Sequence, residues 1–300
     1  MPHMKHLAII GSTASGKSNL ALNLAQSHNA VILSIDSLSI YTGIDIASAK
    51  PSKAELNLVK HFGIDVLRPD ETASVFTFID EYHRACTYAQ AQHKNLIIVG
   101  GSSFYLKSML EGLSPIPTIT DAVREEASHL LMDTREAHRL LTGIDPATMA
   151  NITATDSYRI EKMLHLHLET KLPPSQWFAM HPPLPIIKEC PILNINIERA
   201  TLRERISVRT QLMLGEGLID EVALCEQLYG RSPNSMKAIG MIETLDYLDG
   251  KYSKEALVQR ISTHTAQLAK RQLTFNTHQF NLTANKSINE LTSIGQALLQ

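Results

Sequence analysis

The chain is 300 residues long, with 44% hydrophobic and 19% charged residues and a formal net charge of −2. That length and composition fit a globular protein of one large or two smaller domains, and no apolar run is long enough to cross a membrane. The slightly negative charge excludes a uniformly basic nucleic-acid binder, so any nucleic-acid site must concentrate its positive charge locally.

The first predicted elements are a strand, a glycine-rich turn and a helix. The apolar run Leu7–Ile10 predicts a buried strand, and Asn19–Ala25 predicts a helix. Between them, Gly11–Ser18 fits G-x-x-x-x-G-K-[ST], the pattern of a phosphate-binding loop (P-loop). Backbone amides cradle the phosphate in such a loop, Lys17 reaches the terminal phosphate, and the Ser18 hydroxyl is a candidate Mg²⁺ ligand. The candidate phosphate-binding residues are Gly11, Ser12, Thr13, Ala14, Ser15, Gly16, Lys17 and Ser18.

A second apolar strand, Val31–Ile35, is followed by Asp36. Strand, helix and strand form a βαβ unit, so the first two strands are expected to be parallel. Ligands of such sheets bind beyond the carboxyl ends of the strands, which places Asp36 on the same rim as Lys17 and makes it a candidate for chemistry. An ordinary turn or helix-capping aspartate is the alternative. The irregular stretch Ser37–Lys50 is typical of a binding loop.

A third buried strand, Leu96–Val99, is followed by Gly100-Gly101-Ser102 and by no acidic residue. Many P-loop ATPases place a metal-linked acid at this point, so its absence disfavours a motor or switch NTPase. The surrounding sequence predicts three helices and one strand: helices at Glu55–Lys60, Thr77–Gln92 and Phe104–Leu110, and a strand at Phe62–Leu67.

The middle of the chain is helical. After a break at Gly112–Pro117, the pattern predicts helices at Ala122–Met132, Glu136–Leu141, Pro146–Asn151 and Ser157–Leu168. Proline pairs at 173–174 and 182–183 end this region, and a strand at Ile192–Ile197 resumes the sheet. We therefore predict an α/β fold, with a P-loop NTPase-like parallel sheet flanked by helices and an inserted all-α domain. The expected bounds are 1–115 plus 190–285 for the catalytic core, 116–189 for the insertion and 286–300 for a tail.

An arginine-rich stretch, Glu198–Arg209, follows the last predicted strand. Arg205 and Arg209 stand four residues apart and therefore share one face of a helix. Repeated arginine favours phosphate recognition, and a solvated helix face is the alternative. Further helices are expected at Gly217–Tyr229, Glu243–Leu248 and Glu255–Asn276, before a polar and weakly helical tail.

The three cysteines, Cys86, Cys190 and Cys225, lie far apart and form neither a zinc-ligand pattern nor a disulfide framework. The 13 histidines are scattered without metal-ligand spacing, which favours surface or packed positions. The first apolar run is too short for a secretory leader. We therefore expect reduced cysteines and a cytoplasmic protein.

Six stretches, in this order, resemble the tRNA dimethylallyltransferases, also called tRNA isopentenyltransferases. The matching stretches are Gly11–Ser18 (GSTASGKS), Asp36–Pro51 (DSLSIYTGIDIASAKP), Gly100–Tyr105 (GGSSFY), Glu111–Pro117 (EGLSPIP), Arg205–Gly217 (RISVRTQLMLGEG) and Gln267–Thr274 (QLAKRQLT). Only the central insertion and the tail match loosely. A P-loop alone would be a weak sign, whereas six ordered motifs are a specific one.

The resemblance implies transfer of a dimethylallyl group from dimethylallyl diphosphate to N6 of the adenine directly 3′ of the anticodon, in tRNAs that read codons beginning with U. The implied partners are tRNA (its anticodon stem-loop), dimethylallyl diphosphate and Mg²⁺, with no membrane and no obligate protein partner. The P-loop would then hold a diphosphate leaving group. This agrees with the missing acid after Val99, because no water has to be activated.

The resemblance also implies roles for single residues. Asp36 would accept the N6 proton, Lys17 and Arg209 would stabilise the leaving diphosphate with Thr13 nearby, and Ser18 would bind Mg²⁺. The target base must leave its stack to reach the carboxylate. The residues implied to contact tRNA are Asp36, Ser37, Leu38, Ser39, Ser102, Arg124 and Arg159.

Some residues depart from the family's pattern. In the P-loop, Ser12 stands in place of proline and Ser18 in place of threonine. Departures in the stretches implied to face tRNA are Lys162 for arginine, His165 for glutamate, Met241 for a polar residue and Phe275 for tryptophan. We expect intact chemistry and an altered grip on tRNA or an altered tRNA specificity.

Three other functions remain open from the sequence. A P-loop small-molecule kinase would hold ATP in the loop and use Asp36 to orient an acceptor hydroxyl. A related prenyltransferase would act on free adenine nucleotides. A non-catalytic RNA-binding module would use only the arginine-rich helix.

Overall fold

The structure, a computed structural model, describes residues 4–300. It consists of two compact units: the chain up to Ser108 together with Ile187–Gln300, and Met109–Ile186. The second unit begins and ends earlier than the expected 116–189, because the segments that enter and leave it lie side by side and contact each other. Ile186 N donates to Met109 O at 2.9 Å. The backbone of Gly112 lies against Leu184, where a Cβ would come within 2.4 Å of the carbonyl oxygen.

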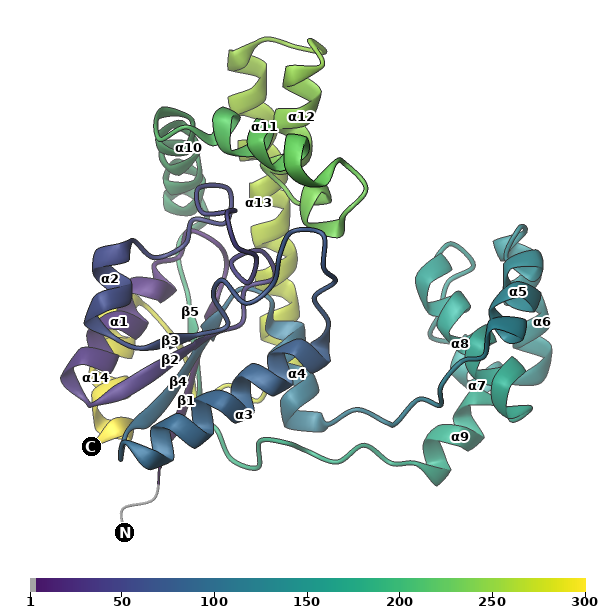
Figure 1. Cartoon of the computed structure of the whole chain (residues 1–300). Helices are drawn as coiled ribbons and strands as arrows, with labels where there is room; N and C mark the ends of the chain where they lie inside the picture. Colours follow the sequence, from purple (N-terminus) through teal and green to yellow (C-terminus); the bar gives the residue numbers. More distant parts are fainter. Residues whose placement is uncertain (1–3) are drawn as a thin grey trace. The chain divides into compact units, whose positions relative to one another are not determined.

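The first unit is built on a six-stranded sheet in the order β3-β2-β4-β1-β5-β6 (Figure 1). All neighbouring strands are parallel, as the βαβ pattern predicts. The strands are β1 (His6–Gly11), β2 (Ala30–Ser34), β3 (His61–Phe62), β4 (Asn95–Gly100), β5 (Ile192–Ile195) and β6 (Ala284–Lys286). Because the strands run the same way, the carboxyl ends of β1, β2 and β4 meet at one edge. This confirms the predicted α/β fold class.

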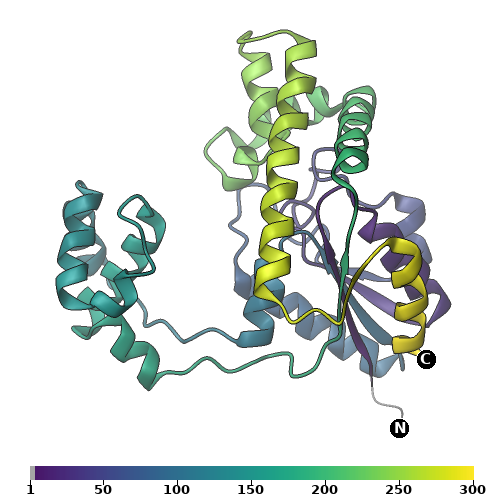
Figure 2. The same cartoon turned by 180° about the vertical axis from the view of Figure 1, so that it is seen from behind.

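Helices cover both faces of the sheet (Figures 1 and 2). The crossover from β1 to β2 and the crossover from β3 to β4 run in opposite directions, so right-handed connections place α1 and α3 on opposite faces. The helices of this unit are α1 (Lys17–Ser27), α2 (Lys53–Leu58), α3 (Val75–Ala91), α4 (Ser103–Glu111, which runs into the second unit), α10 (Arg199–Gly215), α11 (Leu218–Tyr229), the 3₁₀ helix η1 (Asn234–Lys237), α12 (Met241–Leu248), α13 (Lys254–Gln279) and α14 (Ile288–Leu299).

The last helix, α14, corrects the expectation of a separate tail at 286–300. It packs on α1, β1 and β5, and Leu291 and Leu299 belong to a hydrophobic core that α14 shares with α1 and the strands. Gly295 lies so close to α1 that a Cβ would come within 2.6 Å of Leu24 Cδ1. Positions 291, 295 and 299 recur every four residues and form the buried face of the helix. The polar residues before α14 make this face hard to recognise in the sequence.

The second unit is all-α and has its own core. Its helices are α5 (Asp121–Leu130), α6 (Thr134–Ile144), α7 (Pro146–Met149), α8 (Ser157–Thr170) and α9 (Pro174–Met180). Ala127, Leu141, Ile160 and Leu164 are fully buried between α5, α6 and α8. The sequence analysis took the proline pairs at 173–174 and 182–183 as the end of this region, predicted no helix between them, and so missed α9. Pro174 is the first residue of α9, a position where proline needs no hydrogen-bond donor.

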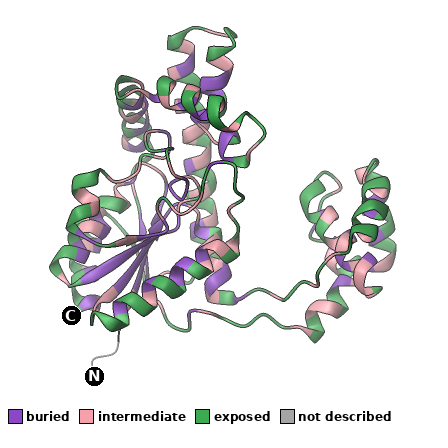
Figure 3. Ribbon diagram, viewed as in Figure 1, coloured by how far each residue is buried: buried purple, intermediate pink, exposed green. Residues whose placement is uncertain are grey.

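Three further features complete the fold. The predicted strand Phe62–Leu67 is shorter in the structure, because Gly63 and Asp65 turn the chain with φ of 73° and 55°. Figure 3 shows that burial is concentrated in the strands, while the outer faces of the helices are exposed. Within residues 4–300, no helix combines the length and the apolar character that a membrane crossing needs.

Candidate active site

The P-loop connects the end of β1 to the first turn of α1. Ala14 and Gly16 have φ of 60° and 93°, the left-handed conformation that lets the chain curl back on itself. Ser15 N donates to Ser12 O at 3.2 Å within this turn. The first amides of α1 have no partner within the helix and carry partial positive charge, so the loop is suited to an anion. Ser18 lies exposed on the same turn of α1.

Lys17 lies at the centre of the site. Its Nζ donates to Ser12 O at 3.3 Å. Burial lowers the pKa of Lys17 to about 8, the charge of Asp36 opposes this shift, and the charge of Arg209 adds to it. These three residues come from separate elements, so their mutual electrostatic influence shows that the fold gathers them. A bound anion would favour the protonated lysine.

Asp36 follows β2 and is both a turn residue and a site residue. Its Oδ1 accepts hydrogen bonds from Leu38 N at 2.9 Å and Ser39 N at 3.2 Å. These bonds fix the orientation of the carboxylate. Burial is the main cause that raises the pKa of Tyr105, and the charge of Asp36 contributes to the same shift. Asp36 therefore lies where the sequence analysis expected it, near Lys17 at the carboxyl edge of the sheet.

Helix α10 brings two arginines to the P-loop. Arg209 Nη1 lies 3.4 Å from Thr13 Oγ1, and Arg205 Nη1 donates to Ser15 O at 3.3 Å. Burial lowers the pKa of Arg209, and the Asp36 carboxylate opposes that shift. Both arginines of this four-residue spacing therefore contact the loop, with Arg209 half-buried and Arg205 still exposed to solvent. Arg209 is placed to contact an anion held there.

Gln272 on α13 is a site residue that the sequence analysis did not single out. Its Oε1 accepts a hydrogen bond from Thr13 N at 2.8 Å, and its Nε2 donates to Gly101 O at 3.0 Å. A Cβ on Gly101 would come within 2.5 Å of Gln272 Nε2 and 3.7 Å of Lys17 Nζ. Gln272 therefore ties the P-loop to the end of β4. Its place in the stretch Gln267–Thr274 was the only sequence signal.

The remaining residues of the first unit that were expected to contact tRNA differ in exposure. Ser37 is exposed, and its backbone amide donates to Ser102 Oγ at 3.2 Å. Ser39 is buried, with its Oγ 3.2 Å from that of Ser34. Leu38 is half-buried. Ser37 and Ser102 are therefore placed to meet a ligand at the rim, whereas the Ser39 side chain shapes the loop from inside.

Arg124 and Arg159 lie in the second unit, on α5 and α8. Both are exposed and lie near acidic neighbours: Arg124 Nε is 3.6 Å from Asp121 and Arg159 Nε is 3.4 Å from Asp156. Arg124 also donates through Nη2 to Ile119 O at 2.9 Å. It lines an open groove of about 820 Å³ together with Lys162 and His165, whereas Arg159 does not line it.

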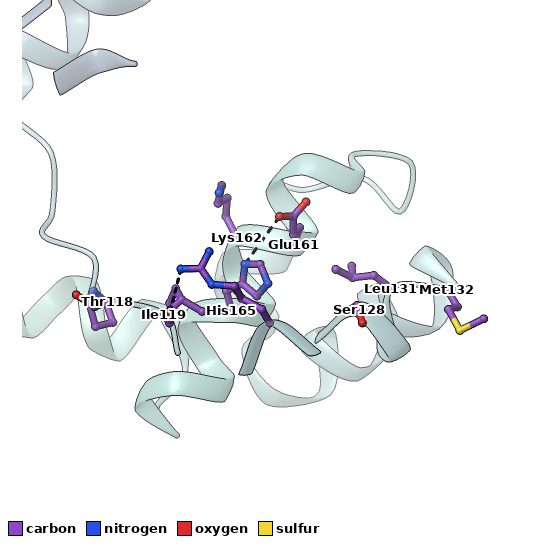
Figure 4. A pocket seen from close by; sticks show the side chains of 10 residues that line it. Thr118, Ile119, Ser128, Leu131, Met132, Glu161, Lys162 and His165 are labelled. Atoms are coloured by element: carbon purple, nitrogen blue, oxygen red, sulfur yellow. Dashed lines mark hydrogen bonds and ion pairs between the residues drawn. The ribbon is translucent and has the colours of Figure 1, made fainter. Parts of the chain in front are cut away.

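Figure 4 shows Glu161, Lys162 and His165 of α8 along this groove, with Ser128 and Leu131 on the other side. His165 Nδ1 lies 3.9 Å from Glu161 Oε1. Burial is the main cause that lowers the pKa of His165. This shift favours the uncharged imidazole, so the permanent positive charges that line the groove are those of Arg124 and Lys162. Two of the departures noted in the sequence meet here.

Ser18 is the one residue that the sequence analysis named as a ligand of Mg²⁺. The Ser18 hydroxyl is exposed at the start of α1. In residues 4–300, no group of three or more histidine, cysteine or acidic side chains could hold a metal ion. Mg²⁺ commonly binds one or two protein oxygens and takes its other ligands from phosphate and water. A Mg²⁺ ion at Ser18 would therefore have to take most of its ligands from a bound phosphate and from water.

Comparison with known proteins shows the family. The family model "IPP transferase" matches residues 39–279. The chain is 52% identical to the tRNA dimethylallyltransferase of Sulfurimonas denitrificans, over 97% of this chain and 98% of that protein. It is 50% identical to that of a Sulfurovum species, over 97% of each chain. The crystal structure of the full-length tRNA isopentenylpyrophosphate transferase from Bacillus halodurans superposes with a TM-score of 0.70 and 28% identity, covering 99% of this chain and 97% of that one. A family-model match of this extent and two relatives at half identity over nearly the full length place the chain in the IPP transferase family.

Proposed function

We propose that this chain is a tRNA dimethylallyltransferase. It transfers a dimethylallyl group from dimethylallyl diphosphate to N6 of the adenosine directly 3′ of the anticodon, in tRNAs that read codons beginning with U. The observation that carries the proposal is the meeting of the P-loop, Lys17, Arg209 and Asp36 at one edge of the sheet, in a member of a family whose relatives carry this name. The reaction belongs in the cytoplasm, with its tRNA substrate.

On the donor side, the P-loop amides hold the diphosphate. Lys17 and Arg209 stabilise the negative charge that grows on the leaving oxygen as the carbon–oxygen bond breaks. Thr13, which lies beside Arg209, orients the guanidinium. Ser18 would hold Mg²⁺, which when bound neutralises part of the diphosphate charge.

On the acceptor side, Asp36 serves as the proton acceptor. The N6 amine attacks C1 of the allylic donor, the electron pair of the breaking C1–O bond goes to the diphosphate, and the N6 proton goes to the Asp36 carboxylate. An exocyclic amine of adenine is a poor nucleophile, because its lone pair is delocalised into the ring. The two hydrogen bonds to Leu38 N and Ser39 N hold the carboxylate ready for this role.

The target base has to leave its stack to reach Asp36. Ser37 and Ser102 at the rim, with Leu38 beside them, are placed to contact the flipped nucleotide. In the second unit, Arg124, Arg159 and Lys162 supply positive charge for the phosphates of the anticodon stem-loop.

A donor and acceptor assay tests this proposal against its rivals. The purified chain is incubated with isotope-labelled dimethylallyl diphosphate in two parallel reactions, one with unmodified tRNA and one with AMP as the acceptor. We expect label on tRNA and none on AMP. Label on AMP alone would support an enzyme of free nucleotides. ATP turnover with a small-molecule acceptor, without any prenyl transfer, would support the kinase.

A further inference from the structure

The loop that follows Asp36 is held by a carboxylate from a distant helix. Glu221, in the first turn of α11, accepts hydrogen bonds from three consecutive backbone amides of this loop. Its Oε2 lies 2.8 Å from Asp45 N and 2.8 Å from Ile46 N, and its Oε1 lies 2.9 Å from Ala47 N. Charge-assisted bonds of this kind are roughly twice as strong as neutral ones. A single side chain therefore fixes the backbone of the whole turn.

Further contacts hold the same segment. One helical turn after Glu221, Cys225 Sγ lies 3.6 Å from Gly43 O. On the other side of the loop, the buried Lys50 ammonium donates to Tyr41 O at 2.5 Å, to Asp45 Oδ1 at 2.7 Å and to Asp65 Oδ1 at 2.6 Å. Residues 43–47 thus contact two successive turns of α11, and Lys50 binds to earlier residues of the same loop.

Glu221 also links the two halves of the proposed reaction. Helix α11 follows α10 directly, and α10 carries Arg209 beside the P-loop. The loop held by Glu221 begins at the proton acceptor Asp36, and its first residues lie at the rim. One helix pair therefore contacts the diphosphate side through Arg209 and the acceptor side through Glu221.

We propose that Glu221 is a positioning residue for the acceptor RNA. Its carboxylate keeps the loop at residues 37–50 in the shape that receives the flipped nucleotide, and it does so without touching the substrate. This inference rests on the proposed function. Loss of the three bonds would loosen this loop and so weaken the binding of the flipped nucleotide.

The test compares Glu221→Gln with Asp220→Asn on the full chain. Asp220 is exposed in the same first turn of α11, so both variants remove one negative charge near the helix N-terminus. In Glu221→Gln we expect faster hydrogen exchange at amides 45–47. We also expect a KM for tRNA raised about tenfold, as for the loss of bonds to a charged group, with an unchanged KM for dimethylallyl diphosphate. Glu221→Asp, which keeps the carboxylate, should recover part of the tRNA KM.

Several outcomes would overturn the positioning role. If exchange at amides 45–47 accelerates while the KM for tRNA matches that of Asp220→Asn, Glu221 only stabilises the fold. If the KM for tRNA and the KM for dimethylallyl diphosphate rise equally, in both Glu221→Gln and Glu221→Asp, the substitutions damage the fold as a whole and not the acceptor loop. If the wild-type chain transfers no dimethylallyl group at all, the proposed function fails. The tRNA affinities of the same variants then still decide whether Glu221 organises an RNA-binding loop.

Discussion

At the scale of single residues, Asp36 combines a structural and a chemical role that one substitution can separate. Asparagine keeps an Oδ1 that can accept from Leu38 N and Ser39 N, but it cannot take up a proton. We expect Asp36→Asn to lower kcat by roughly 10²–10⁴-fold with little change in tRNA affinity. Single-turnover transfer and filter binding measure the two quantities. A rate near that of the wild type would show that Asp36 is a turn residue and not the base.

The lowered pKa of Lys17 predicts a pH dependence of donor binding. In the free protein Lys17 loses its proton above about pH 8, mainly because burial disfavours the charged form. A bound diphosphate favours the charged form, so binding takes up a proton above this pH. The Kd for dimethylallyl diphosphate should therefore be flat below pH 8 and rise by up to about tenfold per pH unit above it.

Titration calorimetry of wild type and Lys17→Met measures this dependence. The methionine variant has no ammonium and should bind weakly, without the rise above pH 8. A Kd that is constant from pH 7 to 10 in the wild type would contradict the charged role of Lys17.

The sequence predicted site residues that lie in or next to a motif, and it missed residues whose partners are distant in the chain. Lys17 lies in the P-loop motif, and Asp36 directly follows an apolar strand. Gln272 meets Thr13 across 259 residues, and Glu221 meets Asp45 across 176. Only the three-dimensional packing brings these pairs together, with α13 against β1 and α11 against the loop at residues 43–47, and no local sequence pattern indicates it.

At the scale of elements, helix α10 brings Arg209 to the P-loop and near Asp36. Arg209→Ala should lower kcat/KM for dimethylallyl diphosphate by roughly 10²–10³-fold, because a charge aimed at the leaving group is lost. Arg203→Ala is the matched control, since Arg203 is exposed on the same helix. Steady-state kinetics with varied donor would measure both. Equal effects of the two substitutions would mean that α10 contributes only a general positive field.

Helix α14 is part of the core, and this has a consequence for stability. Leu291 is fully buried between α14 and the sheet. Leu291→Ala should lower the free energy of unfolding by about 2–5 kcal/mol, as buried leucine truncations do. Gln296→Ala, at an exposed position of the same helix, should change it little. Urea unfolding compares the two, and equal midpoints would show that α14 is a dispensable tail.

The elements also show which patterns are readable from sequence. Central strands such as β1 and β4 are apolar runs because both of their faces are buried, and they were predicted within two residues of their bounds. The short edge strand β6 and helix α9 were missed. Strand β6 is held by pairing with β5 and has little apolar content, and α9 begins at a proline that was interpreted as a break.

At the scale of the whole molecule, the formal charge of −2 is compatible with an RNA substrate, because cations are gathered locally. Arg205 and Arg209 face the P-loop, and Arg124 and Lys162 line the groove of the second unit. The two units are each compact with a separate core, and the first carries every group proposed for the chemistry.

Mass spectrometry of oligonucleotide fragments from a single tRNA tests the central claim most directly. Unmodified tRNA that reads a codon beginning with U is incubated with the purified chain, dimethylallyl diphosphate and Mg²⁺, then cut into fragments and analysed. The account predicts one dimethylallyl-adenosine per tRNA, directly 3′ of the anticodon, and none when that adenosine is replaced by guanosine. Unchanged tRNA, or a dimethylallyl group at any other position, would contradict it.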